Sequence, residues 1–422
     1  MTAPASDLID PAQLCLGLHV HLDIPWTDHP FTFSSFKIKN LEQIATLQAL
    51  GLKQIRYSAA KSDCAPLEEP STPPPVPASV DPADDPLYQA KRARIERLAA
   101  QRARIAACER EFVSSARLVK SIDQNLFARP AIARQEAAQL IGTIADSMLT
   151  DAEVAINLMK DRVGADDTYH HPLNVTVLSM ILAKELQAPK EAIRGLGTAA
   201  LFHDVGKHDI PTTITRKQLA LTKPEISLLQ QHCAYGVEIG RKLGLSQEVL
   251  NVILQHHERV DGSGYPKGLK GNEISMLARI VAVPNMFDNL CNPPNPTRAL
   301  TPHEALSTMY GQQRGHLETK VLNTFIRCMG VYPPGTVVVL SNDALAMVVS
   351  VNSARPLLPT VLVYDPAVPR EEAVLVELEQ AQEVSIVRTL RPTQLPDAAL
   401  DYLSPKARLA YYFDTPGNGP KS

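Results

Sequence analysis

The spacing of apolar residues changes several times along the chain, and the first part carries the pattern of β-strands. Within residues 11–60, the stretch Leu16–Leu22 alternates apolar and polar side chains, and this period of two predicts strands. Leu41–Leu52 instead has apolar residues at helical spacing and contains Gly51, which predicts a short helix that ends there. We therefore expect a small β-rich N-terminal domain over residues 1–65.

A proline-dense stretch and then a helical pattern follow this domain. Residues 66–87 hold too many prolines for a regular helix or a central strand, so they are predicted to be a linker. The basic first part of the next segment favours a solvated helix that pairs two copies of the chain over a helix that binds phosphate. This segment, residues 88–160, is interpreted as a helical connector, with helices expected over 88–118, 131–147 and 151–160.

The helical pattern continues through residues 161–332 and then gives way to strands. Thr301 and Pro302 have the residue types of a helix N-cap and a first helical position. Valine-rich runs beyond this region indicate a β-rich C-terminal tail over residues 333–422, which could complete the N-terminal β unit. The predicted fold class is therefore multidomain α+β, with an all-α helical bundle core. The bundle helices are expected over Leu173–Leu186, Glu191–Phe202, Lys223–Leu243, Gln247–Gln255, Ala278–Leu290, His303–Tyr310 and Glu318–Met329.

Composition narrows the class of protein. The 422 residues carry a net charge of −3 with 21% charged side chains, which argues against a general binder of nucleic-acid polymers. No apolar run is long enough to span a bilayer, and the first residues lack the pattern of a signal peptide, so a cytoplasmic protein is expected. The six cysteines form no CxxC pair, which indicates reduced thiols and no disulfide framework.

The candidate chemistry begins with a pair of adjacent histidines, His256 and His257, at the end of an apolar helical run. Two neighbouring imidazoles are costly to bury unless a ligand or a hydrogen bond satisfies them. Gly262 and Gly264 follow shortly and allow the loop to fold back over whatever the histidines hold. The pattern indicates a metal site beside a loop that covers a ligand.

Further side chains of the types that bind metals lie upstream, and seven of the twelve histidines fall between His170 and His257. A hydrolytic metal site needs imidazole and carboxylate ligands that converge from several helices. Asp204 could bridge two metal ions with its two oxygens. His232 taken alone is more typical of a hydrogen-bonded core histidine, and His170 is expected to face solvent. The candidate ligands in chain order are Asp167, His171, His203, Asp204, His232, His256 and His257.

Two of these motifs also carry a resemblance to a known family. The pair His203-Asp204 with Gly206-Lys207, and then the stretch HHERVDGSGYPKGL, resemble the HD-GYP family, a branch of the HD phosphohydrolase superfamily. The resemblance extends from about Asp166 to Tyr332. The segment LGLHVHLDIPWTDHPFTFSSFKIKN is similar to a small domain that often precedes HD-GYP domains.

The resemblance implies a bacterial signalling enzyme that hydrolyses cyclic di-GMP to pGpG, to GMP or to both. It implies two or three divalent metal ions, Fe or Mn in preference to Mg, Ni or Zn, and a metal-bound hydroxide as the nucleophile. The implied catalytic residues are Asp204 and Lys207, the latter holding a phosphate oxygen. The family's metal-ligand positions fall on His171, His203, Asp204, His232, His256, His257 and Asn285, with Asp167 at an acidic position used by three-metal members. The loop residues that would bind substrate, together with Lys207, are Asp261, Gly264, Tyr265, Pro266 and Lys267, and the same loop could bind partner proteins.

The chain departs from the family motif at two places. The family's ligand Asp falls on Asn285, whose amide oxygen brings no negative charge and binds a divalent cation more weakly. The usual Arg-Pro-Tyr element is replaced by Cys291–Asn295, which leaves the substrate contacts of that element open. These departures favour an alternative, a catalytically weakened domain that senses cyclic di-GMP or binds a partner protein, whereas the intact histidine motifs and Lys207 favour catalysis. A nucleotidase for mononucleotides is a weaker third interpretation, because the GYP loop fits a different substrate.

Overall fold

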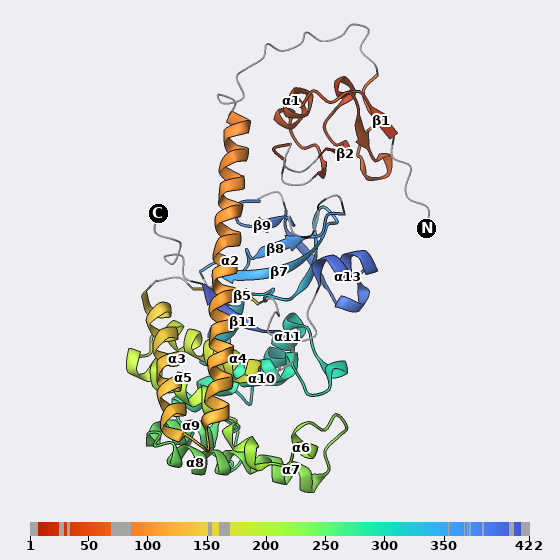
Figure 1. Ribbon diagram of the computed structural model, residues 1–422. Helices are drawn as coiled ribbons and strands as arrows, with labels where there is room; N and C mark the ends of the chain where they lie inside the picture. The colour runs from red at the N-terminus through yellow and green to blue at the C-terminus, as the bar shows by residue number, and fades with distance from the viewer. Residues whose placement is uncertain are drawn as a thin grey trace.

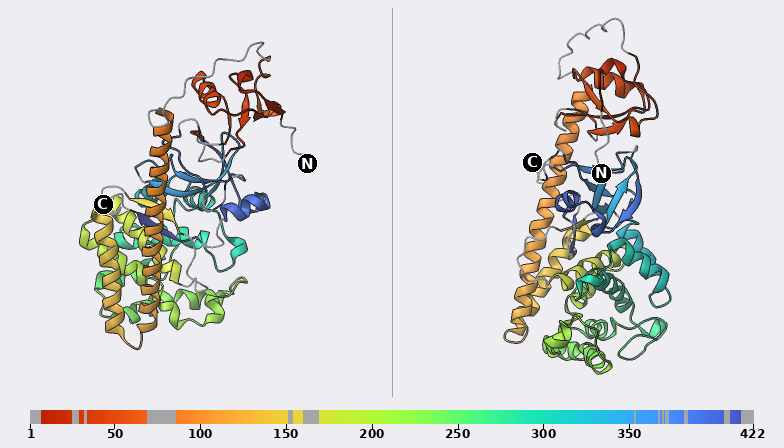
Figure 2. Two further views of the ribbon diagram at one scale, coloured as in Figure 1. Left: turned by 45° about the horizontal axis from the view of Figure 1, so that its top comes forward. Right: turned by 90° about the vertical axis from the view of Figure 1, so that its right-hand side faces the viewer.

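A computed structural model describes residues 7–24, 29–31, 34–68, 86–150, 154–159, 169–352, 354–366, 368, 370, 373–381, 384–404 and 409–414. A long helix joins a small N-terminal domain to a helical bundle, and a β-sheet lies between these two parts (Figure 1). Figure 2 shows the same order of parts from two other directions. The predicted class, multidomain α+β with a helical bundle core and β-rich parts at both ends, is confirmed.

The N-terminal domain has its own sheet and its own core. Its strands pair antiparallel in the order β1-β4-β2-β3. The helix α1 is capped by Asn40, whose side chain accepts a hydrogen bond from the Gln43 N–H, and Gly51 follows with a φ of +66°. The predicted strands and helix of this domain are therefore confirmed, and their bounds are β1 (Asp7–Ile9), β2 (His19–His21), β3 (Ser35–Lys37), α1 (Leu41–Ala49) and β4 (Ile55–Tyr57).

Two helices form the connector. α2 (Pro86–Asn125) is 40 residues long and continues past the predicted end, and α3 (Pro130–Thr150) packs against it. The second half of α2 buries Phe112, Val119 and Ile122 in the main hydrophobic core. In the part of the chain that the structure describes, no helix combines the length and the apolar character needed to cross a membrane.

The bundle surrounds one deeply buried helix, α4, which contacts α5, α10 and α12. The predicted helices are confirmed to within a few residues, and Thr301 caps α11 as expected, with Pro302 in its first position. One prediction is wrong: the helix expected over residues 223–243 is two helices separated at Gln231. The bounds are α4 (His170–Glu185), α5 (Lys190–Phe202), α6 (Thr212–Thr215), α7 (Lys223–Gln230), α8 (His232–Lys242), α9 (Gln247–Gln255), α10 (Met276–Cys291), α11 (Pro302–Gln312) and α12 (Thr319–Met329).

The sheet beyond the bundle includes a strand from the connector, which corrects two predictions. Residues 155–158 form a strand, not the end of a helix, because β5 is paired on both sides, with β7 and with β11. The C-terminal strands do not complete the N-terminal β unit, because the two sheets share no strand among the described residues. The bounds are β5 (Ala155–Leu158), β6 (Val337–Leu340), β7 (Leu345–Asn352), β8 (Thr360–Val363), β9 (Leu375–Glu377), β10 (Ile386–Leu390), α13 (Asp397–Leu403) and β11 (Tyr411–Asp414).

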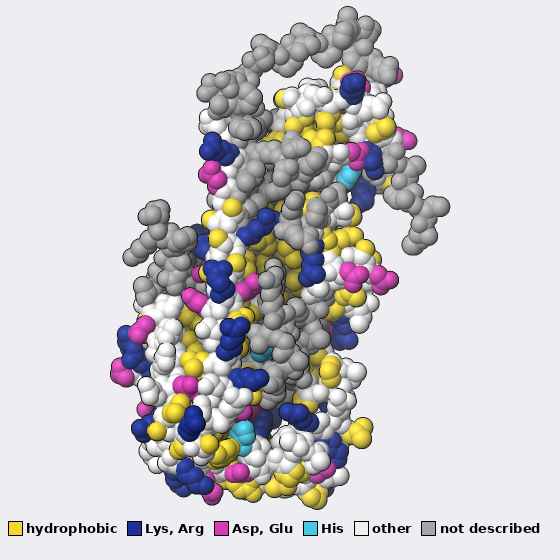
Figure 3. All heavy atoms as spheres, in the orientation of Figure 1, with side chains coloured by type: hydrophobic (Ala, Val, Ile, Leu, Met, Phe, Trp, Pro, Cys, Tyr) yellow, Lys and Arg dark blue, Asp and Glu magenta, His cyan; other side chains and the backbone are white. Residues whose placement is uncertain are grey.

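Charged side chains of both signs share the surface (Figure 3), and the described cysteines form no disulfide. On the face drawn in Figure 3, basic and acidic side chains are interspersed over the helical part. All six cysteines, which lie within the described residues, are free thiols, and four of them are buried.

Candidate metal centre

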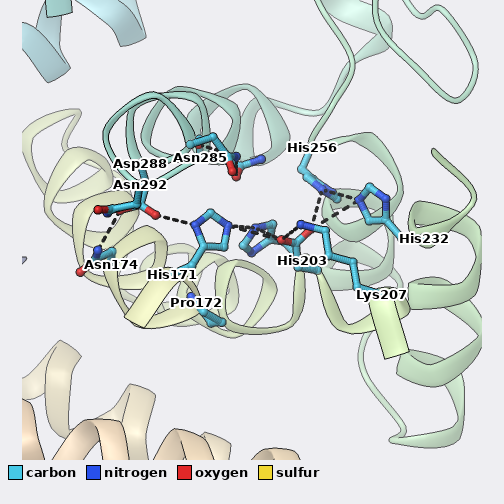
Figure 4. Close-up of polar contacts among 12 residues, drawn as sticks. His171, Pro172, Asn174, His203, Lys207, His232, His256, Asn285, Asp288 and Asn292 are labelled. Carbon is cyan, nitrogen blue, oxygen red and sulfur yellow. Dashed lines mark hydrogen bonds and ion pairs between the residues drawn. The ribbon is translucent and has the colours of Figure 1, made fainter. Parts of the chain in front are cut away.

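Six of the predicted ligands come together where helices of the bundle begin or end. One group contains His171, His203 and Asp204, and the other contains Asp204, His232, His256 and His257. Within each group the atoms that could bind a metal lie within 4.8 Å of one another. Figure 4 draws the imidazoles of His171, His203, His256 and His232 side by side. Asp167 lies outside the described residues.

Backbone carbonyls at helix ends fix the hydrogens on three of the rings. Each Nδ1 donates to the carbonyl oxygen three residues earlier, at 2.6 Å for His203, 2.6 Å for His232 and 2.7 Å for His256. These carbonyls belong to the last turns of α5, α7 and α9, where a helix leaves carbonyl oxygens available for further hydrogen bonds. A carbonyl oxygen only accepts hydrogen bonds, so each Nδ1 carries its hydrogen and each neutral ring has a bare lone pair at Nε2.

The bare Nε2 atoms face one another and a carboxylate. Nε2 of His232 lies 3.3 Å from Nε2 of His256, and Nε2 of His203 lies 3.2 Å from Nε2 of His171. The Asp204 oxygens lie 3.4 Å from Nε2 of His232 and 3.4 Å from Nε2 of His203. Asp204 Oδ1 is buried and has no hydrogen-bond donor among the described residues. The Nε2 atoms of His203, His232 and His256 can only accept hydrogen bonds when their Nδ1 atoms carry the hydrogen, so a cation beside Asp204 would relieve their mutual repulsion.

Burial controls the charge of the side chains in the cluster. It lowers the pKa of His232 and holds the pKa values of His256 and His257 well below the usual range, so these rings are neutral and ready to bind a metal. Burial alone would raise the pKa of Asp204, but the Lys207 ammonium, together with the neighbouring imidazoles, lowers it well below the usual range. The Asp204 carboxylate is therefore ionised.

His171 differs from the other imidazoles because two carboxylates contact it. Burial lowers its pKa, but Asp204 and Asp288 more than compensate and raise it to about 9. Its Nδ1 donates to Asp288 Oδ2 at 2.5 Å, which fixes the direction of Nε2. A metal ion at this ring has to displace a proton. Asp288 was not among the predicted site residues, although it lies one helical turn after Asn285 on α10.

His170 and Asn285 are both buried. His170 is buried and packs against the ring of Phe112, with centroids 5.5 Å apart, so the expectation that it faces solvent is wrong. Asn285 is buried, and its amide oxygen accepts a hydrogen bond of 2.8 Å from Asn289 Nδ2. In Figure 4, Asn285 lies on the α10 side of the imidazoles.

The loop after the histidine pair folds back on the cluster, as predicted. The Tyr265 ring stacks on His257, with centroids 4.6 Å apart and an angle of 21° between planes. A Cβ at Gly264 would lie 2.5 Å from the His257 carbonyl oxygen, so only glycine fits there. Glu258 is buried and accepts from the backbone N–H groups nine and eleven residues later, at 2.7 Å and 2.9 Å. Sequence analysis missed Glu258, which fixes the loop.

The other predicted loop residues divide into internal and exposed ones. Asp261 accepts hydrogen bonds from the Ser263 N–H and hydroxyl, at 3.1 Å and 2.8 Å, and lies 2.7 Å from His316 Nδ1, so its carboxylate is used within the loop. Pro266 and Lys267 are exposed at the loop surface. Lys207, on the other side of the cluster, pairs with Asp204 and keeps 37% of its side chain exposed.

The donor set fits divalent transition metals. Imidazole nitrogen suits ions such as Fe, Ni and Zn, carboxylate oxygen suits Mn, and a carboxylate shared by two groups can contact two ions at once. Metal-binding histidines usually donate their second ring N–H to a carbonyl or a carboxylate, and His171, His203, His232 and His256 do so here. Mg²⁺ prefers oxygen ligands and fits this nitrogen-rich set less well.

Comparison with known proteins agrees with this geometry. Residues 144–321 match the HD domain family, and residues 7–137 match a domain of unknown function, DUF3391. The Pseudomonas aeruginosa protein named cyclic di-GMP phosphodiesterase PA4108 is 29% identical over 360 residues, which are 84% of this chain and 84% of that protein. Residues 144–321 form an HD domain, and the His203-Asp204 pair and the GYP loop within it resemble the HD-GYP branch of that family. The chain is an HD-domain phosphodiesterase.

Other relatives match a shorter part of the chain. The Xanthomonas campestris response regulator RpfG, named a cyclic di-GMP phosphodiesterase, is 35% identical over 149 residues, 35% of this chain and 39% of that protein. A Vibrio cholerae protein named 3'3'-cGAMP-specific phosphodiesterase 3 is 35% identical over 143 residues, 34% of this chain and 31% of that protein. The solved structure of Bd1817 from Bdellovibrio bacteriovorus aligns with a TM-score of 0.40 at 14% identity, over 76% of this chain and 98% of that one.

Replacing His203 or Asp204 should empty the metal site without unfolding the protein. We expect His203→Ala and Asp204→Ala to lose bound Mn(II), because each removes a ligand atom of the cluster and Asp204 belongs to both groups. Metal content after dialysis, measured by atomic emission, checks this. His19→Ala, in the N-terminal sheet, is the matched control and should keep the wild-type metal content. Wild-type Mn(II) content in both cluster variants would refute the assignment.

Proposed function

We propose that this protein is a metal-dependent phosphodiesterase that hydrolyses cyclic di-GMP to pGpG, to GMP or to both. The observation that carries the proposal is the convergence of the Nε2 atoms of His203, His232 and His256 around the Asp204 carboxylate, with His171 beside them. This arrangement suits two divalent ions, Fe or Mn, and Asp167 would add a ligand if a third ion binds. The names of the relatives support the choice of substrate.

The chain's own residues would bind and orient the phosphodiester. What divalent ions supply when bound is a lowered pKa of water, which provides hydroxide near neutral pH, and positive charge that offsets phosphate charge. Lys207 would hold a non-bridging phosphate oxygen as a point charge, because its ammonium already lies against Asp204 and stays partly exposed. Asp204, which both histidine groups share, would bind the ions of both groups beside the reacting phosphate.

The loop would form one wall of the substrate mouth. Tyr265 lies flat on His257, which gives a rigid aromatic surface beside the cluster. Gly264 and Asp261 would act indirectly, because Gly264 allows the close approach to the histidine backbone and Asp261 ties the loop to His316. Lys267 and Pro266 are exposed and could contact the dinucleotide or a partner protein. A homodimer through α2 and α3 stays a prediction.

A sensor function is the second candidate, and one contact favours it. The Asn285 amide oxygen, at the position where the family has a ligand carboxylate, already accepts a hydrogen bond from Asn289. An amide that is neutral and engaged elsewhere holds a cation less well than a free carboxylate. A partly metal-depleted domain would still bind cyclic di-GMP through Lys207 and the loop, with slow turnover.

Turnover by the full chain tests the proposal directly. Protein stripped with chelator and reloaded with Mn(II), or with Fe(II) under anaerobic conditions, should convert cyclic di-GMP to pGpG or GMP on chromatography. Asp204→Ala is the inactive control. The dinucleotide 3'3'-cGAMP belongs in the same assay, since three relatives are named for it. Hydrolysis of 3'3'-cGAMP but not of cyclic di-GMP would replace cyclic di-GMP as the proposed substrate. Binding of cyclic di-GMP without any turnover would favour the sensor function.

Lys207→Ala should slow turnover while leaving metal content nearly unchanged. Loss of one charge-assisted contact to phosphate costs about 1.5–3 kcal/mol, which is roughly a 10- to 100-fold drop in kcat/KM. Lys242→Ala, at an exposed lysine of α8, is the matched control and should behave like wild type. If Lys207→Ala loses metal together with activity, its role is to hold Asp204 and not the substrate.

Asn285→Asp should raise both the affinity for Mn(II) and the rate of phosphodiester hydrolysis. A carboxylate at this position adds negative charge beside the cations and can still accept the hydrogen bond from Asn289. Titration of stripped protein and the turnover assay measure the two effects separately. Asn251→Asp adds the same charge on α9 and should change neither. A wild-type protein that is already fully loaded and fast, with no gain in Asn285→Asp, would contradict a limiting role for Asn285.

A further inference from the structure

The carboxylate that orients His171 is itself held by two asparagines. Asp288 is fully buried, and its Oδ2 accepts the His171 Nδ1–H. Its other oxygen, Oδ1, accepts from Asn174 Nδ2 at 2.8 Å and from Asn292 Nδ2 at 2.9 Å. Asn174 lies on α4, and Asn292 follows the end of α10. Hydrogen bonds to both carboxylate oxygens leave Asp288 little freedom to rotate.

Both asparagines also bind the backbone of the last described segment of the chain. Asn292 Nδ2 donates to the Leu409 carbonyl at 2.9 Å, and Asn292 Oδ1 accepts the Leu409 N–H at 2.8 Å. Asn174 Nδ2 donates to the same carbonyl at 2.9 Å, and its Oδ1 accepts the Tyr411 N–H at 2.9 Å. Each amide therefore bridges Asp288 and the start of β11, and Figure 4 draws Asn174, Asn292 and Asp288 together beside His171.

The partners fix the orientation of both amides. A carbonyl and a carboxylate can only accept, and a backbone N–H can only donate, so exchanging the amide oxygen and nitrogen would break every one of these contacts. Asn174 is fully buried, as are Asp288 and Tyr411, so no water competes for these groups. Removing one member leaves buried polar groups without partners, which makes the network act as a unit.

We propose that Asn174 and Asn292 are positioning residues through which the C-terminal strand β11 holds Asp288, and thereby the metal-binding ring of His171, in place. The C-terminal sheet is then a structural part of the metal centre and not an appended domain. This inference rests on the proposed function only for the assignment of His171 as a metal ligand. It does not depend on which dinucleotide is hydrolysed.

The affinity of the full-length chain for Mn(II) tests this inference. Asn292→Ala, stripped with chelator and titrated by calorimetry, should bind Mn(II) about 10- to 100-fold more weakly at one site, the range for lost contacts behind a metal ligand. The matched control is Ser115→Ala, which cuts the 3.1 Å hydrogen bond between Ser115 and Tyr412 and so loosens β11 without touching Asp288. Ser115→Ala should keep wild-type affinity even if its melting temperature falls.

A double-mutant cycle separates positioning from a general loss of packing. If Asn292 acts through Asp288, adding Asn292→Ala to Asp288→Ala should weaken Mn(II) binding no further. Unchanged affinity in Asn292→Ala, an equal loss in Ser115→Ala, or full additivity with Asp288→Ala would overturn the inference. Should Asn292→Ala not fold, Asn292→Ser keeps a polar group that cannot reach both Asp288 and Leu409 and should show the same loss. Wild-type protein that binds Mn(II) but leaves cyclic di-GMP intact would refute the proposed substrate alone.

Discussion

Helix ends determine the chemistry of this site. His203, His232 and His256 each donate Nδ1–H to a carbonyl from the last turn of a helix, three residues earlier. Carbonyls in the last turn of a helix can accept such bonds because the helix stops there, and each bond leaves a lone pair on the opposite side of the neutral ring. The lone pairs meet around Asp204, where no hydrogen separates them. A cation bound there would relieve the repulsion between these lone pairs. The bundle brings three separate helix ends together, and each of them directs one lone pair toward Asp204.

Much of the metal site could be predicted from residue types, whereas several element boundaries depend on contacts between segments that are distant in the sequence. A metal site with a covering loop was predicted from the adjacent histidines, the His203-Asp204 pair and the glycines of the loop. Six of the candidate ligands do lie together. The break at Gln231, which lets His232 begin a new helix, was missed because the apolar pattern runs through it. The strand β5 was missed for a related reason, since four residues show no decisive period and its partners lie far along the chain.

The residues behind the ligands had no sequence signal of their own. Asn174 and Asn292 are ordinary polar residues until the fold brings the Leu409 backbone against them. Asn292 belongs to the segment that replaces the family's Arg-Pro-Tyr element, so the departure from the motif coincides with a contact to the C-terminal strand. The same strand packs on α2, where Cys108 Sγ contacts the Phe413 carbonyl. The connector, the sheet and the metal centre are therefore one continuous packed body.

Anomalous diffraction from crystals grown with Mn(II) would test the central claim most directly. The account predicts two peaks, one contacted by Nε2 of His171 and His203 and one by His232, His256 and His257, with Asp204 touching both. Nδ1 of His203, His232 and His256 should still lie at hydrogen-bond distance from the helix carbonyls. A cluster with no anomalous peak, in which the Nε2 atoms instead bind ordered water, would contradict it.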